Sequence, residues 1–178
     1  MTPQQVRAER VPTVWTRRLQ TVTFAFAVIL TIGTALQNFV FVDRELIELA
    51  MRYSGNSPEE IESDAPGFLL GFRVVGTLYI IGNAVGLLAF TGKTWVYWVA
   101  IVVNATQAMG VVGAIPPEVL NAMQDLDGGA AYITTLIVDG GGLLLAVVLI
   151  GFFIKFRNPW AQTRSAAPAR TTSDAVNS

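Results

Sequence analysis

The chain has 178 residues, of which 52% are hydrophobic and 14% are charged, and its formal net charge is −1 at pH 7. Soluble domains carry roughly 25% charged residues, so this composition is typical of a membrane protein, and the small net charge does not indicate a nucleic-acid partner. Cysteine and histidine are both absent, which excludes disulfides, thiol redox chemistry, Cys/His metal sites and nucleophiles activated by histidine.

Four stretches of the sequence are long and apolar enough to cross a bilayer, which takes about 20 residues in a helix. They are residues 19–42, 67–90, 94–115 and 131–154. Arg17 and Arg18 precede the first stretch as in a secretory signal, but the apolar run continues to Val42 and is long enough to span. The sequence therefore predicts an all-α membrane protein whose transmembrane domain, 19–156, is a four-helix bundle.

The charges predict how this bundle is oriented. Nine of the twelve Lys and Arg residues lie near the two termini or in the turn between the second and third spans, whereas the loops 43–66 and 116–130 hold ten of the thirteen acidic residues. Loops rich in Lys and Arg stay in the cytoplasm. We therefore expect a cell-membrane protein with both termini cytoplasmic, a short N-terminal tail at 1–18 and a disordered tail at 157–178.

Short helical pieces are expected in both acidic outer loops. Ser57 and Glu60 have the spacing of a capping box, and Pro66 is expected to end that helix before the second span. Pro117 is expected to begin a helix in the other loop. These loops are interpreted as a solvated surface or, alternatively, as a surface that binds cations or partners. Their spacing matches no calcium-binding loop, so no metal site is predicted.

Polar residues inside the spans form the candidate functional cluster, because such residues are costly in lipid and usually face protein or water. The cluster consists of Gln37, Asn38, Arg73, Asn104, Gln107 and Asp139. Arg73 and Asp139 have opposite charges and similar predicted depth, which predicts an ion pair between the second and fourth spans. Two interpretations stay open: a structural network that fixes helix register, and a ligand pocket open to the outside. A single carboxylate without histidine is a poor proton relay.

A stripe of small residues marks the second span as a packing helix. Its members are Gly67, Gly71, Gly82 and Gly86. Small residues at this spacing let helix backbones approach closely. The stripe is expected to pack within the bundle or, alternatively, against another protein.

Three functional hypotheses follow. The first is a non-enzymatic accessory or scaffold subunit of a membrane complex, in contact with the bilayer and with other membrane proteins through the outer loops or the glycine stripe. The second is a small carrier or binding protein for an anionic solute or lipid, with a polar pocket around Arg73 and Asp139. The third, an enzyme acting on a lipid-linked substrate, lacks a nucleophile or second acid near Asp139. No catalytic residue, cofactor or nucleic-acid partner is predicted.

Overall fold

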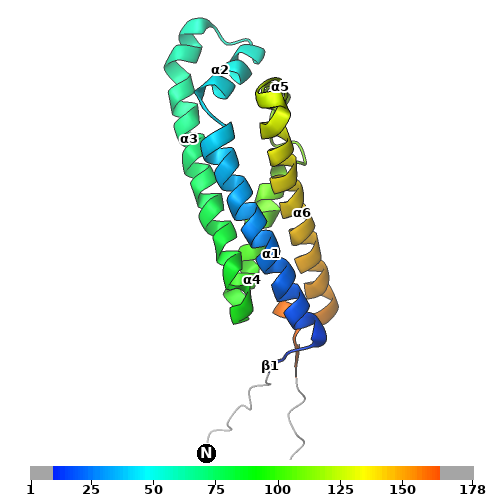
Figure 1. The fold of residues 1–178 in the computed structure, drawn as a ribbon. Helices are drawn as coiled ribbons and strands as arrows, with labels where there is room; N and C mark the ends of the chain where they lie inside the picture. Colours follow the sequence, from blue (N-terminus) through cyan, green and yellow to red (C-terminus); the bar gives the residue numbers. More distant parts are fainter. Residues whose placement is uncertain (1–9, 165–178) are drawn as a thin grey trace, which may run out of the picture.

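The computed structural model describes residues 10–164 and is almost entirely helical (Figure 1). The elements are β1 (Arg10–Val11), α1 (Val14–Leu36), the π-helical turn η1 (Gln37–Phe41), α2 (Arg44–Tyr53), α3 (Pro58–Val85), the 3-10 helix η2 (Gly86–Thr91), α4 (Thr94–Gln107), η3 (Ala108–Gly110), α5 (Pro117–Asp125), η4 (Asp127–Gly129), α6 (Ala130–Phe156), η5 (Pro159–Ala161) and β2 (Thr163–Arg164). The prediction of an all-α chain is confirmed.

Three helical stretches are long and apolar enough to cross a membrane: Val14–Phe41, Pro58–Thr91 and Ala130–Phe156. Their outward faces carry large apolar side chains, and Leu78 and Val147 are 65% and 59% exposed. An apolar exterior of this kind is costly in water and suits a bilayer. The described residues therefore contain three candidate membrane-spanning helices, which is compatible with a membrane protein.

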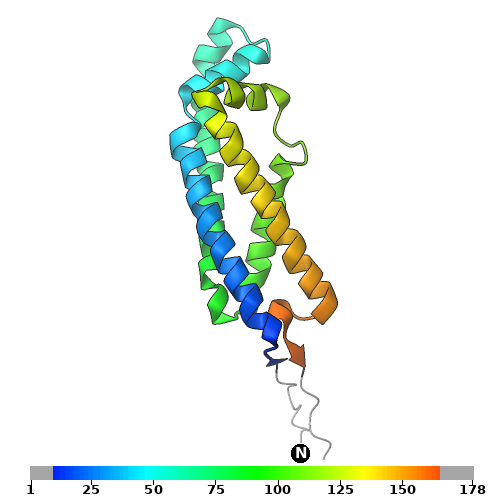
Figure 2. The same ribbon diagram turned by 45° about the vertical axis from the view of Figure 1, so that its right-hand side comes forward.

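The expected third span, 94–115, is shorter as a helix than predicted. α4 has 14 residues and ends at Gln107, and η3 extends it only to Gly110. Figure 2 shows the chain leaving α4 through an irregular segment before α5 begins. Gly113 has a φ of 103° in this segment, which belongs to a turn rather than to a right-handed helix.

α3 begins earlier than the predicted second span. Its N-terminus has the expected capping box, in which Ser57 accepts a hydrogen bond from the Glu60 backbone and the Glu60 side chain accepts one from the Ser57 backbone. Pro66, predicted to end this helix, lies inside it. Proline there removes one backbone hydrogen bond, but Ile61 and Ala65, both buried where α3 packs on α2, keep the helix in place.

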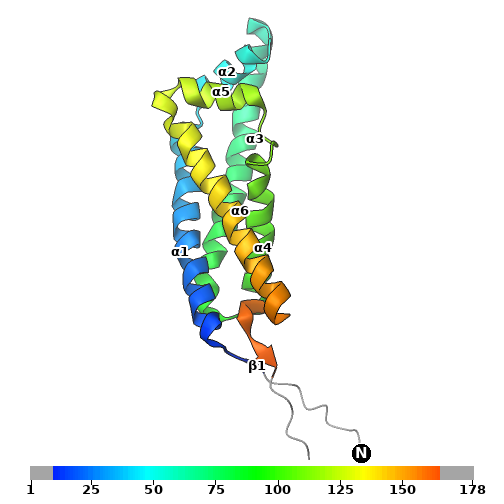
Figure 3. The ribbon, with the colours of Figure 1, turned by 90° about the vertical axis from the view of Figure 1, so that its right-hand side faces the viewer.

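The four longer helices pack around one another, and two short helices cover one end. α1 packs against α3 and α6, and α4 packs against the same two helices. α2 and α5 contact each other and lie across one end of the molecule, called the cap end here (Figure 3). Tyr53 of α2 donates a hydrogen bond of 2.6 Å to the Asp125 carboxylate of α5. This bond is the main cause that raises the pKa of Tyr53 above its ordinary value.

The opposite end, called the termini end, holds both ends of the described chain. β1 pairs antiparallel with β2, and the Thr13 hydroxyl donates a 2.7 Å hydrogen bond to the Ala161 carbonyl. Trp160 is fully buried against Tyr97 and donates from Nε1 to the Lys93 carbonyl at 3.0 Å. The prediction of disorder is therefore wrong for residues 157–164, because an indole and its hydrogen bond hold them against the bundle. The rest of that predicted tail, 165–178, and residues 1–9 of the N-terminal tail lie outside the described residues.

Candidate functional site

Two neighbouring cavities form the candidate site. The larger, called the lateral cavity, has a volume of about 830 Å³ and lies toward the cap end. The smaller, called the polar cavity, has a volume of about 340 Å³ and lies farther toward the middle of the bundle. Both are lined by the same four residues at their junction: Phe72, Val75, Ala114 and Ile115. The two cavities therefore share a wall of side chains between α3 and the segment that follows α4.

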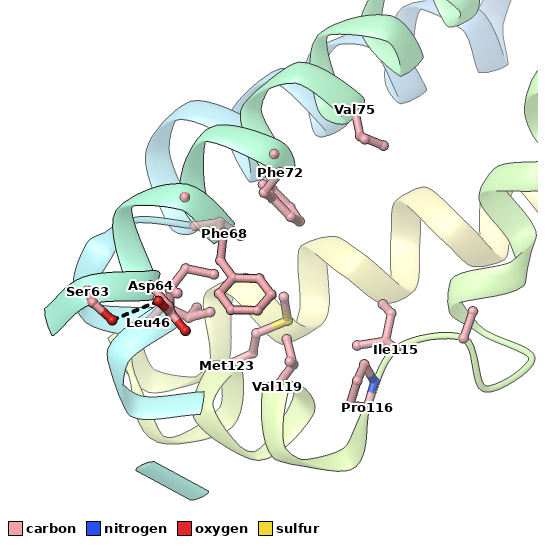
Figure 4. Close-up of a pocket in the computed structure, with 15 residues that line it drawn as sticks. Leu46, Ser63, Asp64, Phe68, Phe72, Val75, Ile115, Pro116, Val119 and Met123 are labelled. Atoms are coloured by element: carbon pink, nitrogen blue, oxygen red, sulfur yellow. Dashed lines mark hydrogen bonds between the residues drawn. The ribbon is translucent and has the colours of Figure 1, made fainter. Parts of the chain in front are cut away.

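The lateral cavity lies between α3 and the segment leading into α5, with α2 at one end. Figure 4 shows Phe68, Phe72 and Val75 of α3 on one side and Ile115, Val119 and Met123 on the other. Phe68 is 60% exposed and Val75 is 52% exposed, so the cavity is open at its side. Its polar lining is confined to Ser63 and Asp64, which are hydrogen-bonded to each other at 2.7 Å at the cap end. The rest of the wall suits an apolar molecule.

The polar cavity brings together side chains from all four longer helices or their extensions. Its polar lining comprises Thr34, Gln37, Asn38, Tyr79, Thr106, Gln107 and Asp139. Four of the six residues of the predicted cluster are among these: Gln37, Asn38, Gln107 and Asp139. The other two, Arg73 and Asn104, line neither cavity. The residues that sequence reasoning did not assign to the cluster include Thr34 and Gly76.

A three-residue network connects α1, α3 and α4 beside this cavity. Asn83 donates through Nδ2 to Gln107 Oε1 at 2.9 Å and to Thr34 Oγ1 at 3.4 Å. Gln107 donates through Nε2 to the same Thr34 oxygen at 3.1 Å. All three residues are buried. Hydrogen bonds between helices contribute to their association in membranes, and these bonds join three helices of the chain.

The end of α1 is widened where it enters the polar cavity. Residues Gln37–Phe41 form a π-helical turn, a feature that is frequent at functional sites. Gln37 donates to Thr135 Oγ1 of α6 at 2.7 Å. Asn38 donates to the Arg73 carbonyl of α3 at 3.3 Å, and its own carbonyl oxygen is buried without a partner. The turn thus places two amides on the cavity wall, and each donates a hydrogen bond to another helix.

Asp139 of α6 is the carboxylate of the polar cavity. It is only 6% exposed. Neighbouring donors are directed elsewhere: Gln107 donates to Thr34, Thr135 to the Ala131 carbonyl at 2.9 Å, and Asn104 to the Ala100 carbonyl at 2.8 Å. A Cβ at residue 110 would overlap Asp139 Oδ2, so a larger residue there would displace this carboxylate. Gly110 is therefore a part of the site that sequence reasoning missed.

The predicted ion pair between Arg73 and Asp139 is wrong for this structure. Within residues 10–164 the ion pairs join Glu48 to Arg44 and to Arg52, both inside α2. The Arg73 guanidinium instead lies over the Phe39 ring, 5.2 Å from its centre. The buried face of α3 carries Gly76 and Asn83, and Arg73 lies to one side of that face. The guanidinium thus lies at an aromatic ring and lines neither cavity, and its Nη1 is buried without a hydrogen-bond partner.

The predicted glycine stripe divides into two parts. A Cβ at Gly82 would meet Val103 of α4, and one at Gly86 would meet Ala27 of α1, so both lie at close helix contacts. Gly67 and Gly71 have open space around them and line the lateral cavity. Only the half of the stripe nearer the termini end therefore lies between helices of this chain.

Across the part of the chain that the structure describes, no three Asp, Glu, His or Cys residues gather as metal ligands. Thr34 lies four residues before Asn38 and therefore on the same face of the first span, which is the signal that could have identified it. Gly76 and Gly110 carried no such signal, because glycine is common in membrane helices. Comparison of the chain with protein-family models, with curated proteins and with solved structures found no match.

Proposed function

We propose that this chain is a small multi-pass protein of the cell membrane that binds an elongated apolar molecule entering from the side of the bundle. The observation that carries this proposal is the lateral cavity and its junction with the polar cavity. The two volumes, about 830 and 340 Å³, fall within the range of sites that hold small molecules. An apolar wall with a few polar groups at one end is the usual composition of such sites.

In this proposal α4 crosses the membrane as a fourth, shorter span, and both termini are cytoplasmic. The charge distribution supports this arrangement. Arg10, Arg17, Lys93 and Lys155 belong to the termini end, whereas the acidic first turn of α3 and the helix α5 belong to the cap end. Positive charge is retained on the cytoplasmic side. The lateral cavity then lies toward the outer leaflet.

The side opening favours a ligand supplied by the membrane. The exposed faces of Phe68 and Val75 belong both to the outer surface of α3 and to the cavity wall. A hydrocarbon chain in the bilayer would reach the cavity along this surface without leaving an apolar environment, so entry would expose little apolar area to water. The geometry favours this function over an accessory subunit, which requires no internal cavity.

The polar groups support binding more than catalysis. The cavity contains one carboxylate and neutral amides and hydroxyls. Hydrolysis or group transfer needs a nucleophile with an oriented base, or two carboxyl groups of which one acts as an acid and the other as a base or nucleophile. Among the described residues that line the polar cavity, these pairs are absent. A site of this kind can orient a ligand through hydrogen bonds.

The test uses two glycines of matched surroundings. Gly71 in α3 and Gly151 in α6 are both helical and exposed with open space at the Cβ position, but only Gly71 lines the lateral cavity. Wild-type protein, Gly71→Trp and Gly151→Trp are purified in mild detergent, and the lipids that co-purify are identified by mass spectrometry. We expect one class of molecule to be enriched over bulk membrane lipid in wild type and Gly151→Trp and to be lost in Gly71→Trp. Equal lipid profiles in all three proteins would contradict the proposal.

A further inference from the structure

One side-chain acceptor on the wall of the polar cavity lacks a donor. The Asn38 side-chain oxygen is buried without a hydrogen-bond partner, and Asn38 as a whole is 1% exposed. Its amide nitrogen is already committed to the Arg73 carbonyl, so the oxygen is the free end. A buried acceptor left unpaired costs roughly 1–3 kcal/mol. A donor on a bound molecule would remove that cost.

Asp139 adds a carboxyl group to the same cavity. Of the described residues that line the cavity, Asp139 is the single carboxylate and none is Lys or Arg. Arg73, which the sequence predicted to pair with Asp139, lies over Phe39 and lines neither cavity. A buried carboxylate needs a partner or must give up its charge. The cavity is therefore complementary to a cation and unfavourable for an anion.

Two glycines leave room for these acceptors. A Cβ at Gly76 would overlap the Asn38 side-chain oxygen, and a Cβ at Gly110 would overlap Asp139 Oδ2. Both glycines line the polar cavity together with the aromatic ring of Tyr79. An aromatic face attracts a cation placed over it. The backbone at these two positions is thus shaped around a carboxylate and an amide oxygen, with an aromatic ring on the same wall.

We propose that the molecule bound here is a lipophilic amine, whose protonated N–H group lies in the polar cavity against Asp139 and Asn38 and whose apolar chain lies in the lateral cavity. This inference rests on the proposed binding function and adds the chemical class of the ligand. It replaces the anionic ligand expected from Arg73. A charge-assisted hydrogen bond from an ammonium to a carboxylate is stronger than a neutral one, which gives the site its selectivity.

The test compares three probes of equal chain length: hexadecylamine, hexadecan-1-ol and hexadecanoate. Native mass spectrometry measures their binding to the full chain in mild detergent. For wild-type protein we expect the amine to bind about tenfold or more tightly than the carboxylate, which corresponds to roughly 1.4 kcal/mol or more. This comparison needs no variant, so it stands even where a substitution impairs folding.

Variants then test whether Asp139 causes the preference for the amine. Asp139→Asn should lower binding of the amine about tenfold while leaving binding of the alcohol nearly unchanged, because the alcohol needs no negative charge. Asp125→Asn, which removes an acid outside both cavities, is the matched control and should bind all probes as wild type does. Equal binding of amine and carboxylate to the wild type, or equal amine binding to wild type and Asp139→Asn, overturns the ligand class alone. If Gly71→Trp binds every probe as well as wild type does, the cavity itself is not the site and the proposed function fails.

Discussion

The network of Asn83, Gln107 and Thr34 gives a quantitative test of how the helices are held together. Replacing Gln107 by leucine removes its bond to Thr34 and the bond it accepts from Asn83. Interhelical hydrogen bonds in membrane proteins contribute about 0.6 kcal/mol on average and up to about 1.7 kcal/mol. The variant loses two hydrogen bonds and leaves the Asn83 amide with only a 3.4 Å contact to Thr34. We therefore expect its free energy of unfolding to fall by roughly 1–3 kcal/mol.

A double-mutant cycle isolates the bond that joins α3 to α4. Asn83→Leu alone should cost a similar amount, because it also removes two donations of this network. The bond from Asn83 to Gln107 is lost in either single variant and is counted twice in their sum. The double variant should therefore lose about 0.6–1.7 kcal/mol less than that sum.

Unfolding of the purified protein by sodium dodecyl sulfate, followed by tryptophan fluorescence, measures these losses. The buried Trp160 reports on the bundle because it packs on Tyr97. Thr77→Val is the control, since the Thr77 hydroxyl donates only to a carbonyl of its own helix, and it should change stability by less than about 0.5 kcal/mol. Additive losses for Asn83→Leu and Gln107→Leu would refute the network as a coupled unit.

Three further predictions concern the two ends of the molecule. Single cysteines at Ser57 and Gln124 should react with an impermeant maleimide added outside intact cells, and one at Thr91 should not; labelling of Thr91 from outside would overturn the proposed orientation. Trp160→Ala should destabilise the protein by about 3–5 kcal/mol, because a fully buried indole is removed; its unfolding is followed by the fluorescence of the remaining tryptophans, of which Trp98 also packs on Tyr97, and a loss below about 1 kcal/mol would contradict its anchoring role. Since the pKa of Tyr53 is raised in the folded protein, the stability from its hydrogen bond is complete below pH 10.0, the ordinary pKa of tyrosine, and is lost as the pH rises through the folded-state pKa. The difference between wild type and Tyr53→Phe should follow that course, and a difference that grows with pH would contradict it.

Much of the helical layout could be predicted from the sequence, because apolar length and end signals are local properties. The expected fourth span, 131–154, corresponds closely to α6 at Ala130–Phe156. The capping box at Ser57 was also local and is present. Pro66 was misjudged because a proline usually ends a helix, whereas here the packing of neighbouring residues on α2 outweighs one lost backbone bond. That packing depends on how α2 folds back on α3, which the residues around Pro66 do not specify.

The candidate site was predictable in its residue types and less so in its geometry. Gln37, Asn38, Gln107 and Asp139 stand out in the sequence because polar groups are rare in spans, and the structure gathers them around one cavity. Arg73 stands out equally, but helical phase alone does not say which face of a helix points inward. On α3 the inward face contains Gly76 and Asn83. Arg73, which the sequence placed in the cluster, therefore lies outside the cavity.

The lateral cavity exists because α4 is short. α4 ends at Gln107, and the chain reaches α5 through an irregular segment, so the half of α3 nearer the cap end has no full-length neighbour on that side. In the proposed membrane arrangement, irregular backbone at this depth is tolerated where it is buried in protein or lines a cavity. Gly110, Ala114 and Ile115 of that segment line the polar cavity. A regular helix over 94–115 would satisfy its own backbone but would place side chains where the cavities now lie. The departure from a regular fourth helix is therefore what makes room for a ligand in this small bundle.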